Sequence, residues 1–233
     1  MNDRDLFRTD PSKDWVIVGW FSPDYRPLAE KFAQSLRLLA IPHHLFARPQ
    51  TQQWDTSSKP LIVLHAMNLY RGKTIILMDV DCIITGDISP LANLDGDVSF
   101  NLSLRRRKHE RMTIYSSSRV VVFKPTAGAR RFAEAWAYWC DGPERNDEIN
   151  LTHAYVHNGG TAHVQLPARF AAWEVGNKSA PEDVVIWHQS AHRKSEPITL
   201  RWLVRSLEKP FRRGRTKAIK AAGARPRMRE AAE

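Results

Sequence analysis

Cysteine is scarce in this sequence, and long apolar runs are missing. Two cysteines in 233 residues are too few for the disulfide framework of a small secreted domain. No stretch approaches the roughly 18 consecutive apolar residues that a membrane-spanning helix needs. The first residues, MNDRDLFRTDPSKD, are polar and acidic, whereas a secretory signal is basic and then apolar. We therefore expect a cytoplasmic protein.

Acidic residues are scarce at one end of the chain only. Residues 201–233 contain eleven Lys and Arg against three Glu, while the other 200 residues contain 24 Lys and Arg against 22 Asp and Glu. The net charge of +10 therefore belongs mostly to a C-terminal tail, residues 200–233. This tail begins with an apolar stripe, which consists of Leu200, Leu203, Leu207 and Phe211.

An apolar stripe beside many cations is typical of a peripheral anchor on an anionic membrane surface, here the inner face of the membrane. The alternative is that the first turns of the tail pack on the domain and the rest stays disordered. The sequence leaves both open. Nucleic-acid binding is less favoured, because the body of the chain lacks aromatic platforms combined with a basic groove.

Two apolar spacings alternate along residues 1–199. Short apolar runs with strand character are followed by longer segments whose apolar residues recur at helical spacing. This alternation predicts one α/β domain with a mainly parallel, Rossmann-like sheet flanked by helices. Ligands of such sheets bind beyond the carboxyl ends of the strands. The predicted strands are 15–21, 43–49, 73–79, 97–102, 119–125 and 183–190, and the predicted helices are 28–40, 59–72, a segment ending at 141, and 147–160.

Two aspartates, Asp79 and Asp81, follow the buried strand KTIILM directly. Carboxylates separated by one residue can converge on a hard divalent cation such as Mn²⁺ or Mg²⁺, which prefers oxygen ligands and often shares them with substrate phosphates. Such a cation would stabilise a diphosphate leaving group. The alternative is a solvated turn in which Asp81 caps the next segment.

Three segments resemble the GT-A glycosyltransferases, especially the family 8-like group. The segment IILMDVDCIITGDISPL resembles the DxD segment of that group. The segment VVIWHQSAHRK carries His188 six residues before Lys194, as the group does after its last core strand. The segment SSSRVVVF, an aromatic helix and then DEINLTHAY resemble the acceptor-side strand of the group and its later DQ helix start.

This resemblance implies a GT-A fold and a metal-dependent glycosyltransferase. The enzyme would move a sugar from a nucleotide-diphosphate donor, with UDP favoured, to a glycan, lipid-linked or other hydroxyl acceptor, with retention of configuration favoured. Asp79, Asp81 and His188 would bind Mn²⁺ or Mg²⁺, and Lys194 would contact the donor diphosphate. Asp79 would also reach the ribose.

The other expected site residues flank this set. Ser22, Asp24 and Tyr25 follow the first strand and would lie near the nucleotide; a plain loop is the alternative. Asp147 and Glu148 would supply a base if the enzyme inverts configuration, although acidic residues also favour any helix start. The group often has a basic residue in the helix before DxD, and for that place this chain offers His65.

Two other functions fit parts of the sequence. In a HAD-type phosphohydrolase, Asp79 would be the nucleophile and Asp81 the acid/base, but the late strand then should end in acids rather than in His188. The chain could also be a non-catalytic protein that binds polyanions or a membrane surface. The basic run Ser103 to Met112 predicts a solvated loop, or else a place for an anionic acceptor.

Overall fold

The computed structural model describes residues 5–48, 58–106, 112–144, 146–173 and 183–188. The chain divides into two units, Met1–Ser190 and Ala191–Glu233, and every described residue belongs to the first. Lys194 and the tail, residues 200–233, therefore lie outside the described residues. Within the described part, no helix combines the length and the hydropathy that crossing a bilayer requires.

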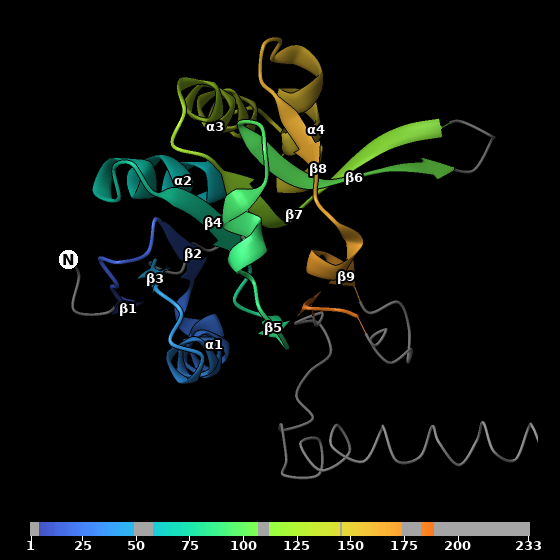
Figure 1. Cartoon of the computed structure of the whole chain (residues 1–233). Helices are drawn as coiled ribbons and strands as arrows, with labels where there is room; N and C mark the ends of the chain where they lie inside the picture. The colour runs from blue at the N-terminus through green and yellow to red at the C-terminus, as the bar shows by residue number, and fades with distance from the viewer. Residues whose placement is uncertain (1–4, 49–57, 107–111, 145, 174–182, 189–233) are drawn as a thin grey trace, which may run out of the picture. The chain divides into compact units, whose positions relative to one another are not determined.

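The first unit is built around a seven-stranded sheet with the order β1-β3-β2-β4-β7-β6-β8 (Figure 1). Strands β2, β3, β4, β6 and β8 run in one direction, and β1 and β7 run in the other. The predicted α/β class with a mainly parallel sheet is confirmed. The strands are β1 (Leu6–Arg8), β2 (Trp15–Phe21), β3 (His43–Ala47), β4 (Thr74–Met78), β6 (Val98–Arg106), β7 (Met112–Phe123) and β8 (His163–Gln165).

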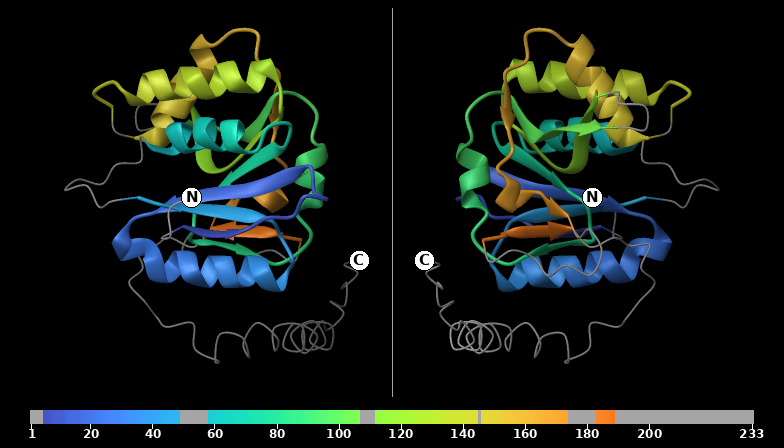
Figure 2. Two further views of the ribbon diagram at one scale, coloured as in Figure 1. Left: turned by 90° about the vertical axis from the view of Figure 1, so that its left-hand side faces the viewer. Right: turned by 90° about the vertical axis from the view of Figure 1, so that its right-hand side faces the viewer.

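Helices cover both faces of this sheet (Figure 2). Helix α1 packs against one face, and α2, α3 and α4 pack against the other. The helices are α1 (Arg26–Leu38), α2 (Ser58–Leu69), α3 (Ala127–Cys140) and α4 (Asp147–His157), and short 3₁₀ turns span Pro23–Tyr25, Ser89–Asn93 and Ala168–Phe170.

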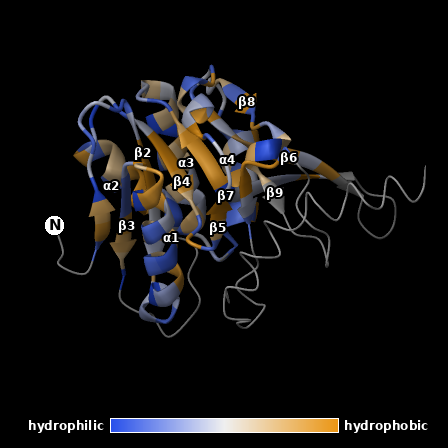
Figure 3. Cartoon of the chain, turned by 60° about the horizontal axis from the view of Figure 1, so that its bottom comes forward, coloured by the Kyte–Doolittle hydropathy of each residue, from blue (hydrophilic) through white to orange (hydrophobic). Residues whose placement is uncertain are grey.

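The apolar runs of the sequence fill two cores, one on each face of the sheet. In β2, Trp15 and Ile17 face α1, while Val16 and Val18 face the three other helices. Because a strand covered on both faces buries every side chain, it appears in the sequence as an unbroken apolar run. Figure 3 shows this hydrophobic character along the central strands.

A second, three-stranded sheet has the order β5-β10-β9. It consists of β5 (Cys82–Ile84), β10 (Ile186–His188) and β9 (Ala172–Trp173). The late strand predicted at 183–190 is thus a short member of this small sheet and not of the main one. Strand β5 follows the two aspartates immediately, which explains why the chain becomes apolar again: Cys82 and Ile84 are buried.

The register of β7 shifts where it leaves the core. Phe100 of β6 lies opposite Val121, but the next residue, Asn101, lies opposite Ser117. Residues 118–120 of β7 therefore have no partner on β6. Extra residues of this kind bend a strand and redirect its side chains.

Candidate metal and substrate site

Asp79 and Asp81 lie in a tight turn between β4 and β5. The Asp79 N–H donates to the Arg119 carbonyl at 3.1 Å, and the Cys82 N–H donates back to the Asp79 carbonyl at 3.1 Å. This turn bends the chain at the carboxyl end of β4, so both carboxylates reach the same place. The solvated turn considered above is excluded, because the side chain of Asp81 is only 11% exposed and that of Asp79 23%.

Strand pairing brings His188 to the two carboxylates across more than a hundred residues of sequence. β10 runs antiparallel to β5, with His188 opposite Cys82. The His188 Nε2 atom lies 2.9 Å from Asp81 Oδ1 and 3.4 Å from Asp79 Oδ2. One ligand atom from each of the three residues lies within 4.8 Å of the others.

The two carboxylates favour the charged form of His188. Burial alone would lower its pKa, but the hydrogen bonds and charges of Asp79 and Asp81 raise the pKa of His188 to about 9. Burial conversely raises the pKa of Asp79, and Lys59 and His188 lower it by more, so the pKa of Asp79 is below its usual value. The charged His188 ring neutralises the same carboxylates that a divalent cation would neutralise. The donor set of two carboxylates and one imidazole fits Mn²⁺ or Mg²⁺.

Lys59, in the first turn of α2, is a site residue that the sequence reasoning missed. Its Nζ atom lies 2.8 Å from Asp79 Oδ1 and 2.7 Å from Asp147 Oδ2, and it donates to Ser118 Oγ at 3.0 Å. The side chain is only 7% exposed. Burial lowers the pKa of Lys59, but the two carboxylates raise it above its ordinary value. Lys59 therefore stays charged and joins the two acidic parts of the site.

The basic residue that was not evident in this helix is Lys59, and His65 lies away from the acidic cluster. His65 is exposed and packs edge-on against Phe46, with 5.4 Å between ring centroids. Lys59 directly precedes Pro60, which marked the helix start in the sequence, and a lysine at a helix start usually extends into solvent. The alternation of neighbouring residues gives no sign that Lys59 turns inward. Its carboxylate partners, Asp79 and Asp147, lie far from it in the sequence, so no local pattern marks the contact.

Asp147 and Glu148 begin α4 and face different partners. The Asn146 side chain caps the helix by accepting from the N–H groups of Glu148 at 2.9 Å and Ile149 at 3.1 Å. Asp147 contacts Lys59 and accepts from Ser118 Oγ, whereas Glu148 accepts from the Tyr115 hydroxyl and lies 3.5 Å from Arg119 Nη2. The shifted residues 118–120 of β7 thus reach both acidic side chains.

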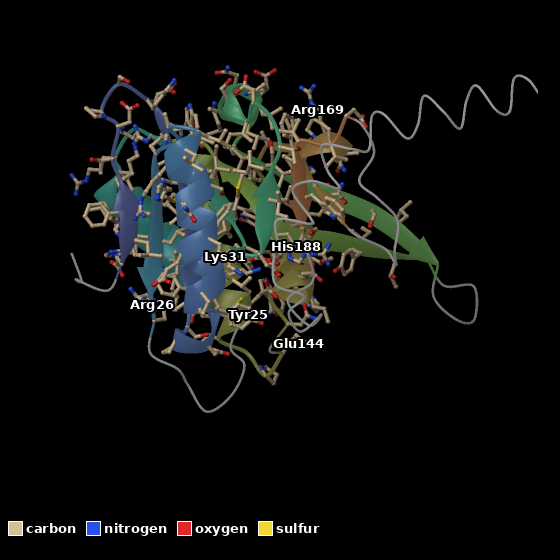
Figure 4. The ribbon with its side chains drawn as sticks, turned by 90° about the horizontal axis from the view of Figure 1, so that it is seen from below. Tyr25, Arg26, Lys31, Glu144, Arg169 and His188 are labelled. Atoms are coloured by element: carbon tan, nitrogen blue, oxygen red, sulfur yellow. The ribbon has the colours of Figure 1, made fainter. Side chains whose placement is uncertain are left out.

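The three residues expected near the nucleotide lie in the loop after β2 and its 3₁₀ turn. Ser22 donates to Asp24, which keeps the turn closed on itself. Tyr25 is half-buried, and burial together with the charges of Asp81, Asp24 and Asp79 raises the pKa of its phenol to about 12. Figure 4 shows Tyr25 and His188 at the same end of the molecule. The charges of Asp79 and Asp81 thus act on the phenol of Tyr25.

Comparison with solved structures identifies the fold. A glycosyltransferase involved in the glycosylation of the major capsid of PBCV-1 superposes with a TM-score of 0.54 at 10% identity, over 76% of this chain and 92% of that one. An active-site glutamine-to-glutamate variant of LgtC gives a TM-score of 0.50 at 10% identity, over 82% and 94%. This chain has the GT-A fold.

Comparisons by sequence give no match of this kind. No family model matches the chain, and no curated protein matches it by sequence. Another structure, of galactosyltransferase LgtC with donor and acceptor sugar analogues, has a TM-score of 0.49 at 11% identity, over 76% of this chain and 87% of that one. The predicted GT-A fold is confirmed, and a HAD-type phosphohydrolase is not favoured. The narrower resemblance to family 8 stays a prediction.

Proposed function

We propose that this chain is a metal-dependent glycosyltransferase that uses a nucleotide-diphosphate sugar, with a UDP-sugar favoured. The observation that carries the proposal is the convergence of Asp79, Asp81 and His188 at the carboxyl end of a GT-A strand. Buried carboxylates need a neutralising partner, and a divalent cation shared with a diphosphate supplies one that is also useful for catalysis.

In this proposal Asp79, Asp81 and His188 would hold Mn²⁺ or Mg²⁺. When bound, the cation neutralises the charge that develops on the diphosphate leaving group. Lys59 fixes the Asp79 carboxylate at 2.8 Å and thereby sets its orientation before any ligand arrives. Tyr25 lies on the nucleotide side with Ser22 and Asp24, and Lys194 would contact the diphosphate.

The acceptor side is formed by the start of α4. Glu148 is held by Tyr115 and Arg119, and Asp147 by Lys59 and Ser118. Because Asp147 is already ion-paired, it is better suited to orienting groups than to taking a proton, and this supports the retaining course. If the enzyme inverts configuration, Glu148 is the base.

The acceptor that we propose is a glycan or a lipid-linked glycan. The basic tail, residues 200–233, motivates a peripheral location on the inner face of a membrane. No nucleic acid is expected as a partner.

The experiment is a panel of nucleotide sugars incubated with Mn²⁺, with slow donor hydrolysis as the readout. We expect one donor, most naturally a UDP-sugar, to be hydrolysed, and Asp81→Asn to lose this hydrolysis. The matched control is Asp95→Asn, which removes an exposed carboxylate elsewhere in the domain. Absence of hydrolysis for every donor, together with UDP binding that is equal in Mn²⁺ and in chelator, would contradict the proposal.

A further inference from the structure

Strands β6 and β7 continue beyond the body of the domain as a two-stranded arm (Figure 1). We define the arm as residues 101–106 of β6 and residues 112–117 of β7, which pair with each other from Asn101↔Ser117 to Arg106↔Met112. The basic run expected to be a solvated loop therefore begins and ends inside strands.

One face of the arm carries an apolar pair that nothing covers in the described part of the chain. Opposed residues in an antiparallel pair share a face, and every second residue returns to it. Leu102, opposite Ser116, packs against the core with α3 and α4. Two positions further out, Leu104 lies opposite Ile114, and these side chains are 68% and 45% exposed. The apolar face of the sheet thus extends past the helices that cover it.

The charge next to this pair is mostly positive. The segment from Ser103 to Met112, SLRRRKHERM, has five Lys and Arg against one Glu. Arg105 and Arg106 belong to β6 and directly follow Leu104. Exposed aliphatic side chains flanked by arginines suit the boundary between lipid headgroups and acyl chains, where the apolar groups insert and the cations meet anionic headgroups.

This combination favours lipid over the other occupants of such a face. A second copy would bring two strongly cationic arms together, which costs free energy. A glycan would be bound better by aromatic side chains than by leucine and isoleucine, because ring faces pack on sugar rings. An anionic bilayer surface complements both the charge and the apolar pair.

We propose that the arm is a contact site for anionic membrane surfaces, with Leu104 and Ile114 as its apolar pair and with the cationic residues Arg105 and Arg106 next to this pair in the sequence. The contact stands apart from glycosyl transfer and is measured without any donor. If the transferase proposal also holds, β7 would connect the membrane contact to the acceptor side, since Tyr115 lies next to Ile114 and bonds Glu148.

The test uses the full chain and vesicles of phosphatidylcholine with or without phosphatidylglycerol, with co-sedimentation as the readout. We expect Leu104→Ser with Ile114→Ser to lower the partition coefficient for anionic vesicles about fivefold or more, because the inserted apolar area is lost. Arg105→Glu with Arg106→Glu should lower it about tenfold or more and weaken its salt dependence. The control is Leu38→Ser, which removes a leucine that is 82% exposed on α1.

Two further measurements separate the contribution of the arm from misfolding and from binding by the tail. Unchanged far-UV circular dichroism and melting temperature must show that the variants fold. In a full chain whose tail carries Arg212→Glu, Arg213→Glu and Arg215→Glu, the arm substitutions should still lower the binding that remains.

Three outcomes would overturn the proposal. The first is that the arm variants bind anionic vesicles as the parent chain does. The second is that the tail reversal alone reduces binding to the level of neutral vesicles. The third is that sedimentation shows an oligomer that Leu104→Ser with Ile114→Ser dissolves while vesicle binding is unchanged, which would make the face a protein interface.

Discussion

Two clusters of buried charge lie at different places on the main sheet, and they differ in how their charge is balanced. Beside β1 and β3, Asp5 accepts from His44 Nε2 at 3.1 Å and from the Ala47 N–H at 2.8 Å, while His44 Nδ1 bonds the Tyr70 hydroxyl at 2.7 Å. Burial lowers the pKa of His44, which favours the neutral ring. A single carboxylate is satisfied there by neutral donors.

The site at the end of β4 has the opposite balance. Three carboxylates, those of Asp79, Asp81 and Asp147, share the cations Lys59 and His188. Counted over the described residues, this cluster has more carboxylates than lysine or arginine partners and would favour a further cation, whereas the His44 cluster pairs its single carboxylate with neutral donors. The difference teaches that burial alone does not distinguish the candidate site from a structural cluster, whereas a surplus of carboxylates among the described residues does.

The largest expected effect is on metal-dependent nucleotide binding. Asp81→Asn removes one carboxylate of the proposed metal site, so Mn²⁺-dependent UDP affinity should fall by more than roughly 100-fold, beyond the loss typical of outer-shell partners. Isothermal calorimetry with Mn²⁺ and with chelator measures it. Asp5→Asn, in the His44 cluster, should leave UDP affinity unchanged. A comparable loss of UDP affinity in both variants would remove the distinction between the two clusters.

The next effect is on stability. Lys59→Met leaves Asp79 and Asp147 buried without their shared cation, which should lower the free energy of unfolding by about 3 kcal/mol in urea. The double variant Lys59→Met with Asp147→Asn should regain part of this loss, because one uncompensated carboxylate is gone. Equal stabilities of the single and double variants would mean that Lys59 acts through packing alone.

A smaller effect concerns the N-terminal caps of α3 and α4. It distinguishes a cap that positions site residues from a cap that only stabilises its helix. Asn146→Ala removes the N-terminal cap of α4. Thr126→Ala removes the N-terminal cap of α3, where the Thr126 side chain accepts from the Ala129 N–H at 3.0 Å. Each should cost about 1 kcal/mol of unfolding free energy. Only Asn146→Ala should also slow donor turnover, since it loosens the start of α4 that carries Asp147 and Glu148. Equal turnover in the two variants would count against that role.

The smallest effect is a pH dependence of the unfolding free energy that comes from the His44 cluster. The pKa of His44 in the folded state is below the ordinary value of 6.5, so the unfolded chain binds a proton that the folded chain does not. The contribution of His44 to stability is therefore present above about pH 6.5 and is lost as the pH falls below it. Urea unfolding at a series of pH values should show a shallower acid slope for His44→Gln, and an unchanged slope would reject this origin.

The sequence predicted the strand-and-helix order because long apolar runs have a clear period. It also predicted that Asp79 and Asp81 lie at the end of β4, because they directly follow a strong strand signal, while His188 was added by the resemblance to the family 8-like group. It did not place β10 in a separate sheet, because three residues are too few to carry a period. The role of Asp79, Asp81 and His188 as metal ligands, like the roles of Lys194 and the tail, stays a prediction.

Two features could not be predicted from the sequence, for one physical reason. Lys59 turns inward and the basic run from Ser103 enters β6, although both look like solvated cations. Whether a cation is buried depends on carboxylates that are distant in sequence, and whether it joins a strand depends on a partner strand. Neither partner is visible in the local pattern of residues.

The register shift in β7 separates the contacts of the candidate site from the length and charge of the hairpin. Residues 118–120 hold Lys59, Asp79 and Glu148 in place, while the pairing beyond them repeats every two residues. Adding or removing paired residues at the far end of the hairpin would alter its length and charge without moving those contacts. The far end of the hairpin could therefore change to suit another surface while the candidate metal site keeps its geometry.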